Sequence, residues 1–206
     1  MMQVLAWGID KANGQLAGAR FLPSPHCDAR SQDVEPELIV VHGISLPPGE
    51  FGGAWIDDLF LGHLDASAHP YFAAIAHLRV SAHLLIRRDG AVTQYVPFGL
   101  RAWHAGVSSF VGRAGCNDFS IGIELEGTDE IPYTEAQYAA LAEVIAALHT
   151  AYPSLRAIAG HADIAPGRKT DPGASFEWQR LQRMLASTGV SAHDSLNAAR
   201  LMLISA

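Results

Sequence analysis

The feature that most constrains the fold is the run ELIVVHGIS at residues 37–45, which is almost continuously apolar and rich in β-branched side chains. Such a run is typical of a strand buried on both faces, whereas a strand with one face in water alternates apolar and polar residues. A strand of that kind needs one layer of structure above it and another below it. The chain is therefore predicted to build a covered central sheet, with His42 and Gly43 near the end of this strand.

Three more segments predict strands. Residues 80–98, VSAHLLIRRDGAVTQYVPF, contain two β-rich runs joined by Asp89 and Gly90, which indicates a hairpin with a type I′ turn. Residues 119–127, FSIGIELEG, alternate in a way that places Glu124 on the face opposite to the apolar side chains on either side of it. Residues 155–160, LRAIAG, form a short apolar run that ends at His161.

Helices are predicted between these strands. Residues 134–152 begin with a Thr-x-x-Gln capping box and carry Tyr138, Leu141, Ile145 and Leu148 on one face, before Pro153. Residues 175–188 form a second amphipathic pattern, and residues 51–64 and 69–78 are short helical or irregular connections. Strands that alternate with helices, together with a hairpin, predict an α/β or α+β domain in which helices cover a mixed central sheet.

Length and composition narrow the possible classes of protein. The chain has 206 residues and no linker-like stretch, so we expect one domain over residues 1–187, with a helical tail at 188–206 packed on it. A net charge of −7 argues against a nucleic-acid partner. The sequence contains no signal-peptide pattern and no apolar run long enough to span a membrane, and Cys27 and Cys116 allow at most one disulfide. We therefore expect a cytoplasmic protein, and a monomer.

The chain has ten histidines, and their positions relative to the predicted strands indicate which of them are candidates for a functional site. His42 and His161 each end an apolar strand and adjoin a glycine, which is where an α/β sheet presents side chains to a crevice. Asp163 and Asp171 offer a carboxylate nearby, and two imidazoles with one carboxylate are a common protein ligand set for catalytic zinc. The competing interpretation is that each histidine only makes a hydrogen bond in the core or at the surface. For His83 and His104 the pattern also allows a place in the lining of a pocket without metal ligation.

Five long segments occur in an order that resembles a known family. They are LIVVHGISLPPGEFGG, AHLRVSAHLLIRRDG, RAWHAGVS, CNDFSIGIELEGTD and GHADIAPGRKTDPG. Together they resemble the AmpD family of N-acetylmuramoyl-L-alanine amidases, within the wider zinc amidase class that includes phage lysozyme-type amidases and peptidoglycan-recognition proteins. The resemblance extends from about residue 18 to about residue 185. It implies the single-domain fold of that class.

The resemblance also implies roles for individual residues. His42, His161 and Asp171 would be the Zn²⁺ ligands, and Asp163 would brace the loop between them. Glu124 would be the catalytic carboxylate and Lys169 the cation beside the metal. From the residues alone, Glu126 on the same face is a competing base, and Lys169 is equally well explained as a solvent-exposed side chain.

The implied substrate is the amide between N-acetylmuramic acid, preferably in its 1,6-anhydro form, and L-alanine of the stem peptide, in peptidoglycan recycling. Arg79, Ala102 and Trp103 match positions that line the sugar and peptide sites in the family. The chain departs from the family at Gly43 and Gly115, where asparagine and arginine are frequent, so two substrate contacts are missing. Two other functions stay open: a broad amidase that acts on polymeric peptidoglycan, and a peptidoglycan-binding module without catalysis.

Overall fold

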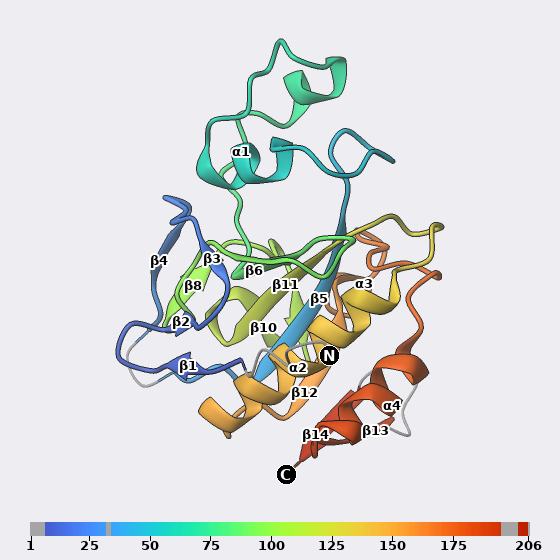
Figure 1. Cartoon of the computed structure of the whole chain (residues 1–206). Coiled ribbons are helices and arrows are strands. Elements are labelled where there is room, and N and C mark those ends of the chain that lie inside the picture. The colour runs from blue at the N-terminus through green and yellow to red at the C-terminus, as the bar shows by residue number, and fades with distance from the viewer. Residues whose placement is uncertain (1–6, 32–33, 195–201, 206) are drawn as a thin grey trace.

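Strand β5 (Leu38–Ile44) lies inside an eight-stranded mixed sheet, between the parallel strands β11 (Ser120–Glu126) and β12 (Ala157–Gly160). The protein is seen here as a computed structural model that describes residues 7–31, 34–194 and 202–205 (Figure 1). The strand order is β13-β14-β12-β5-β11-β6-β7-β3. The prediction of a mixed central sheet covered by helices is confirmed.

The remaining elements flank this centre. The other strands of the sheet are β3 (Arg20–Phe21), β6 (Leu84–Ile86), β7 (Val92–Gln94), β13 (Ser191–Asp194) and β14 (Met202–Ser205). Three two-stranded pairs lie beside it: β1 (Ile9–Asp10) with β2 (Gln15–Leu16), β4 (Cys27–Ala29) with β8 (Leu100–Ala102), and β9 (Ser109–Phe110) with β10 (Arg113–Ala114). The helices are α1 (Trp55–Leu61), α2 (Glu135–Ala151), α3 (His161–Ile164) and α4 (Trp178–Ser187), with 3₁₀ turns at Pro70–Ala74 and Cys116–Asp118.

The two faces of β5 are buried in different clusters. Ile39 and Val41 pack into a large core with the apolar side chains of α2 and α4. Leu38 and Val40 pack on the other face, with residues of β12 and of the segments before β11. A strand covered on both sides explains why residues 38–41 are all apolar. His42 follows Val40 on the face opposite α2, because side chains alternate along a strand.

Helix α2 forms where the sequence predicts it. The hydroxyl of Thr134 accepts a hydrogen bond from the backbone N–H of Gln137, and the amide oxygen of Gln137 accepts one from the N–H of Thr134. This is the predicted capping box. The helix buries the predicted face, consisting of Tyr138, Leu141, Ile145 and Leu148.

Two local predictions were wrong. The hairpin between β6 and β7 is present, but only Gly90 of its turn has positive φ, whereas a type I′ turn needs two such residues. The side chain of Asp89 instead accepts a hydrogen bond from the N–H of Ala91, which stabilises a longer turn. The tail, predicted to be helical, forms strands β13 and β14 over its described residues.

Strands β13 and β14 of the tail belong to the same eight-stranded sheet as the central strands. Strand β14 pairs antiparallel with β12, and β13 pairs with β14. Pairing with the open edge of β12 satisfies backbone groups that a helix in this position would leave unpaired, which explains the strand. The domain boundary at residue 187 stays a prediction.

Two further expectations concern cysteines and membranes. Cys27 and Cys116 are both free thiols, so the single disulfide that the sequence allows is not formed. Among the described residues, none of the helices combines the length and apolar character that crossing a bilayer requires.

Candidate active site

The candidate site lies at the carboxyl ends of the three central parallel strands. In the register of the sheet, Glu124 of β11 stands beside His42 of β5, and Gly160, the last residue of β12, stands beside Val41. His161 follows Gly160 as the first residue of α3. Because parallel strands end at the same edge of a sheet, their terminal side chains converge there. Sheet topology therefore brings His42, Glu124 and His161 together.

Three potential metal ligands meet at this edge. Nδ1 of His42 lies 2.9 Å from Nδ1 of His161 and 3.3 Å from Oδ2 of Asp171, and Nδ1 of His161 lies 3.1 Å from the same Oδ2. Both imidazoles are almost fully buried. Ligands placed tetrahedrally about 2.0–2.1 Å from a zinc ion would be separated by a little over 3 Å. The described residues His42, His161 and Asp171 thus form a cluster that can hold a metal ion.

The protonation states suit metal ligation, which requires neutral imidazole and ionised carboxylate. Burial lowers the pKa of His42 to about 4, so its ring is neutral near pH 7. Burial acts to raise the pKa of Asp171, but hydrogen bonds with His161 and His42 outweigh it and hold that pKa well below its ordinary value. Asp171 is therefore an anion that faces the neutral ring of His42.

The carboxylate of Glu124 is buried next to this cluster. Its Oε1 lies 4.0 Å from Nδ1 of His42, and among the described residues its Oε2 has no hydrogen-bond partner. Burial, together with the negative charge of Asp171, raises the pKa of Glu124 well above its ordinary value, although Lys169 opposes the shift. A buried carboxyl oxygen without a partner, beside potential metal ligands, is suited to exchange a proton with a bound water or substrate.

A cavity of about 580 Å³ opens onto these groups. Its lining includes Glu124, His161, Asp171, Lys169 and His104, together with Leu59 and Phe60 of α1. The volume falls in the range of small-molecule sites, about 300–1,000 Å³. Polar and apolar groups thus line one cleft that can accept a substrate of that size.

Hydrogen bonds also shape the loop between His161 and Asp171. Oδ2 of Asp163 accepts a hydrogen bond of 2.7 Å from the N–H of Gly160, which braces the start of α3. The backbone N–H of Lys169 donates to the carbonyl of Ala165, so the loop folds back and its exposed side chain lines the cleft. Lys169 is therefore solvent-exposed and beside the cluster at the same time.

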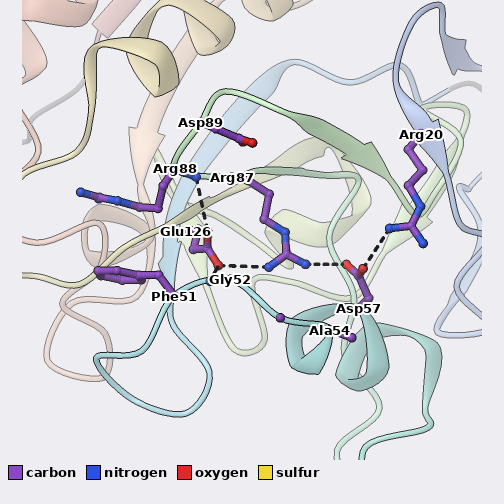
Figure 2. Close-up of a pocket in the computed structure, with 10 residues that line it drawn as sticks. Arg20, Phe51, Gly52, Ala54, Asp57, Arg87, Arg88, Asp89 and Glu126 are labelled. Carbon is purple, nitrogen blue, oxygen red and sulfur yellow. Dashed lines mark hydrogen bonds and ion pairs between the residues drawn. The ribbon is translucent and has the colours of Figure 1, made fainter.

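Glu126, the competing base, is already engaged elsewhere. Its Oε1 accepts hydrogen bonds from the N–H of Gly52 at 2.6 Å and from the guanidinium of Arg87 at 3.0 Å. Its Oε2 accepts from the N–H of Arg88 at 3.3 Å. Figure 2 shows this carboxylate enclosed by the loop of Gly52 and by the two arginines. With both oxygens occupied, Glu126 is less suited than Glu124 to exchange protons.

Arg87 connects Glu126 to helix α1. Its other terminal nitrogen lies 3.0 Å from Oδ1 of Asp57, and Arg20 approaches Oδ2 of Asp57 at 3.3 Å (Figure 2). Oδ1 of Asp57 also accepts a hydrogen bond from the hydroxyl of Tyr95. Asp57 lies two residues before Leu59 in α1, and Leu59 lines the cleft. The ion-pair chain Glu126–Arg87–Asp57 therefore ties the cleft wall to the strand that carries Glu124.

The three residues predicted to contact the substrate lie outside the described lining of the cleft. Arg79 is exposed, in a segment whose neighbours Leu78 and Val80 line the cleft. The side chain of Ala102 is fully buried in an apolar cluster. The indole N–H of Trp103 donates to Asp28 at 3.2 Å. These three residues do not appear in the described lining of the cleft, and their role stays a prediction.

The two histidines whose role the sequence left open have different positions. His83 lies in the core: its Nδ1 accepts from the N–H of Gly122, and its Nε2 lies 3.1 Å from the carbonyl of Leu100. His104 lines the cleft, and its Nδ1 lies 2.9 Å from Nε2 of His42. Burial lowers the pKa of both rings, that of His83 to about 3. Sequence spacing offers no signal for the contact between His42 and His104.

Comparisons with known proteins agree with this geometry. The profile of the N-acetylmuramoyl-L-alanine amidase family matches residues 32–174. The chain is 65% identical over 173 residues to the 1,6-anhydro-N-acetylmuramyl-L-alanine amidase AmpD of Citrobacter freundii, which covers 84% of this chain and 92% of that protein. A crystal structure of a selenomethionine derivative of AmpD superposes with a TM-score of 0.83 at 63% identity, covering 86% of this chain and 98% of the other.

A more distant structure was solved with a substrate. The Escherichia coli amidase AmiD, in complex with anhydro-N-acetylmuramic acid-L-Ala-D-γ-Glu-L-Lys, superposes with a TM-score of 0.53 at 28% identity, covering 81% of this chain and 63% of that one. The matched family region contains His42, Glu124, His161 and Asp171. The chain belongs to the N-acetylmuramoyl-L-alanine amidase family.

Proposed function

We propose that this protein is a zinc-dependent amidase that hydrolyses the bond between N-acetylmuramic acid, preferably in its 1,6-anhydro form, and L-alanine of the stem peptide, as a step of peptidoglycan recycling. The observation that carries the proposal is the cluster of His42, His161 and Asp171 beside the buried carboxylate of Glu124. AmpD relatives that are named for this reaction support it at 53–65% identity.

The donor set fits zinc. Two imidazole nitrogens and one carboxylate oxygen are a frequent protein set for catalytic zinc, with a fourth position left for water or substrate. His42 and His161 would hold the ion through Nδ1, and Asp171 would hold it through Oδ2. Bound there, zinc supplies a Lewis acid that polarises the amide carbonyl and lowers the pKa of the attacking water.

Glu124 would carry the proton. Its free Oε2 can accept a proton from the attacking water and then return it to the nitrogen of L-alanine, which leaves as an amine. The return matters because an amide nitrogen is a very poor leaving group until it is protonated. The raised pKa of Glu124 lets the side chain hold that proton between the two steps.

Lys169 would stabilise the negative charge that develops on the carbonyl oxygen. Two observations support this role: the residue lines the same cleft, and its charge acts to lower the pKa of Glu124. Electrostatic donors of this kind act without reorganisation when they are held in place before the reaction. The apolar side chains of Leu59 and Phe60, which also line the cleft, would limit the access of water.

The substrate itself is the finer part of the proposal. The AmiD complex, whose ligand is an anhydromuramyl tripeptide, supports a related ligand for this chain. Arg79, Ala102 and Trp103 would contribute substrate contacts, a proposal that rests on the family resemblance of these positions. We further propose that the enzyme acts as a monomer in the cytoplasm.

The test is to incubate the zinc-loaded protein with anhydromuramyl tripeptide and, separately, with intact murein sacculi, and to identify the products by mass spectrometry. Release of free tripeptide from the small substrate alone supports the recycling role. Release of stem peptides from sacculi at a comparable rate supports a broad amidase instead. Binding of the tripeptide without cleavage, with zinc present in stoichiometric amount, would contradict the enzymatic proposal.

A further inference from the structure

The imidazole of His42 has both of its nitrogens engaged. Nδ1 faces His161 and Asp171 in the metal cluster, and Nε2 lies 2.9 Å from Nδ1 of His104. A neutral imidazole has one N–H donor and one lone pair. If the Nδ1 lone pair serves the metal, the proton is on Nε2, and Nδ1 of His104 must accept it.

The acceptor role of Nδ1 in His104 also determines where the ring of His104 carries its own proton. Because its Nδ1 accepts, its own proton is on Nε2, which lies 3.1 Å from the hydroxyl oxygen of Ser120. The hydroxyl of Ser120 in turn lies 2.5 Å from the backbone carbonyl of Cys116. A carbonyl can only accept, so Ser120 must donate to it and use a lone pair for His104. The chain of hydrogen bonds therefore has one direction, which is determined at the end farthest from the metal cluster.

The position of His104 is specified by its surroundings. Gly122 lies beneath the ring, and a Cβ atom there would lie 2.6 Å from Nδ1 of His104, so only glycine leaves room for it. The side-chain oxygen of Asn117 accepts hydrogen bonds from the N–H groups of His104 and Ala105, at 3.1 and 2.8 Å. Both the ring and the backbone of His104 are thus held in place.

Ala105, the residue after His104, contacts the second histidine ligand, His161. The carbonyl of Ala105 lies 3.2 Å from Nε2 of His161 and also accepts a hydrogen bond of 2.6 Å from Arg168. Two consecutive residues, anchored together by Asn117, therefore accept from the outer nitrogens of both histidine ligands. Acceptors behind a ligating histidine hold the tautomer and the ring orientation that metal binding requires.

We propose that His104 is a positioning residue of the metal centre: it accepts the Nε2 proton of His42 and so keeps the Nδ1 lone pair of His42 directed at the ion, and Ser120 sets the direction of this hydrogen bond. The inference deepens the proposed function, because it rests on zinc binding by His42, His161 and Asp171. It assigns His104 no contact with the substrate or with the ion.

The experiment compares zinc affinities, measured by competition with a chromophoric chelator, for wild type, His104→Leu, His104→Asn and Ser120→Ala. Asparagine can place its side-chain oxygen near the position of Nδ1, whereas leucine fills the space without an acceptor. We expect His104→Leu to weaken zinc binding by about 10–100-fold, as is typical for loss of such an acceptor. His104→Asn should recover most of the lost zinc affinity. The zinc affinity of Ser120→Ala should lie between those of His104→Leu and His104→Asn. His77→Leu, at an exposed position, is the matched control and should bind zinc as wild type does.

A second measurement does not depend on the folding of any variant. Nitrogen-15 NMR of the histidine rings in the wild-type, zinc-loaded protein reports which nitrogen of His42 carries the proton. We expect the proton on Nε2 of His42 and on Nε2 of His104. A proton on Nδ1 of either ring, or a His104→Leu variant that binds zinc within about threefold of wild type, would overturn the proposal.

The outcomes also separate this inference from the proposed function. Wild type that binds zinc through these ligands but cleaves no anhydromuramyl peptide would contradict the function and leave the role of His104 standing. Wild type that binds no zinc would contradict both. If His104→Asn is as impaired as His104→Leu, the ring contributes by packing rather than as an acceptor, and the positioning role is wrong.

Discussion

Nδ1 of His42 and Nδ1 of His161 lie 2.9 Å apart, although 119 residues separate them in the chain. The contact exists because β5 and β12 are parallel neighbours whose carboxyl ends meet at one edge of the sheet. Both Nδ1 atoms also lie close to Oδ2 of Asp171, at 3.3 Å from His42 and 3.1 Å from His161. A metal ion that takes all three lone pairs gives each of these buried groups a partner.

Substitutions of Glu124 and Asp171 should have different effects on zinc content. Glu124→Gln removes the group that exchanges the proton and leaves the metal ligands in place, so kcat should fall by about 10²–10⁴-fold while zinc content stays at one per chain. Asp171→Ala removes a ligand and should lose both zinc and activity. Zinc content by atomic spectroscopy and turnover by chromatography check this prediction, and equal zinc loss in the two variants would show that Glu124 is misassigned.

Lys169 should affect turnover more than binding. Lys169→Met keeps the length of the side chain without its charge, so we expect kcat to fall by about 10²–10³-fold, with KM changed by only a few-fold, because the charge acts on the oxyanion rather than on the ground state. Lys169→Arg should recover part of the rate. Lys11→Met, which removes a charge placed over the ring of Tyr152, is the control and should keep full turnover. A rise in KM alone for Lys169→Met would assign Lys169 to substrate binding.

The ion-pair chain Glu126–Arg87–Asp57 should contribute to stability and not to chemistry. Glu126→Ala leaves the largely buried guanidinium of Arg87 with Asp57 as its remaining described carboxylate, and should lower the free energy of unfolding by about 2–4 kcal/mol. Zinc content should be unchanged. Denaturant unfolding measures the loss, and Glu177→Ala, which breaks an exposed ion pair with Arg180, should cost less than about 1 kcal/mol. A loss of stability for Glu126→Ala no larger than for that control would contradict the prediction.

His83 should make the fold sensitive to acid. Burial holds its pKa at about 3 in the folded protein, whereas the unfolded chain takes up a proton near pH 6.5. The unfolded state therefore binds more protons in that range, and stability should fall by up to about 1.4 kcal/mol per pH unit as the pH drops from about 6.5 toward 3.

The check is His83→Asn, whose side-chain oxygen can still accept the N–H of Gly122. This variant should be less stable than wild type at pH 7.5 by about 1–3 kcal/mol, since it leaves the carbonyl of Leu100 without its partner. The difference should narrow as the pH falls, because the variant has no imidazole to protonate. Unfolding curves measured from pH 7.5 to 4.5 that stay parallel would exclude His83 as a source of the acid sensitivity.

Local patterns in the sequence determined much of the fold and part of the site. The apolar run at residues 37–45 predicted a strand covered on both faces, and the capping box at Thr134 predicted the start of α2. Such patterns act through neighbours a few residues apart, which is why they can be interpreted without a structure. The resemblance to known amidases then singled out His42, His161 and Asp171, which the fold brings together.

Tertiary structure decided what depends on distant partners. Glu124 and Glu126 look alike in the sequence, and only the contacts of Gly52 and Arg87 with Glu126 tell them apart. The described residues of the tail form two antiparallel strands rather than a helix because β12 offered an open edge. The contact of His104 with His42 had no local signal, since 62 residues separate them. It forms only when the segment after β8 packs its His104 ring against Gly122 of β11, the strand beside β5. Protonation and hydrogen bonding in the site depend on burial and on long-range contacts, and both arise only when the chain has folded.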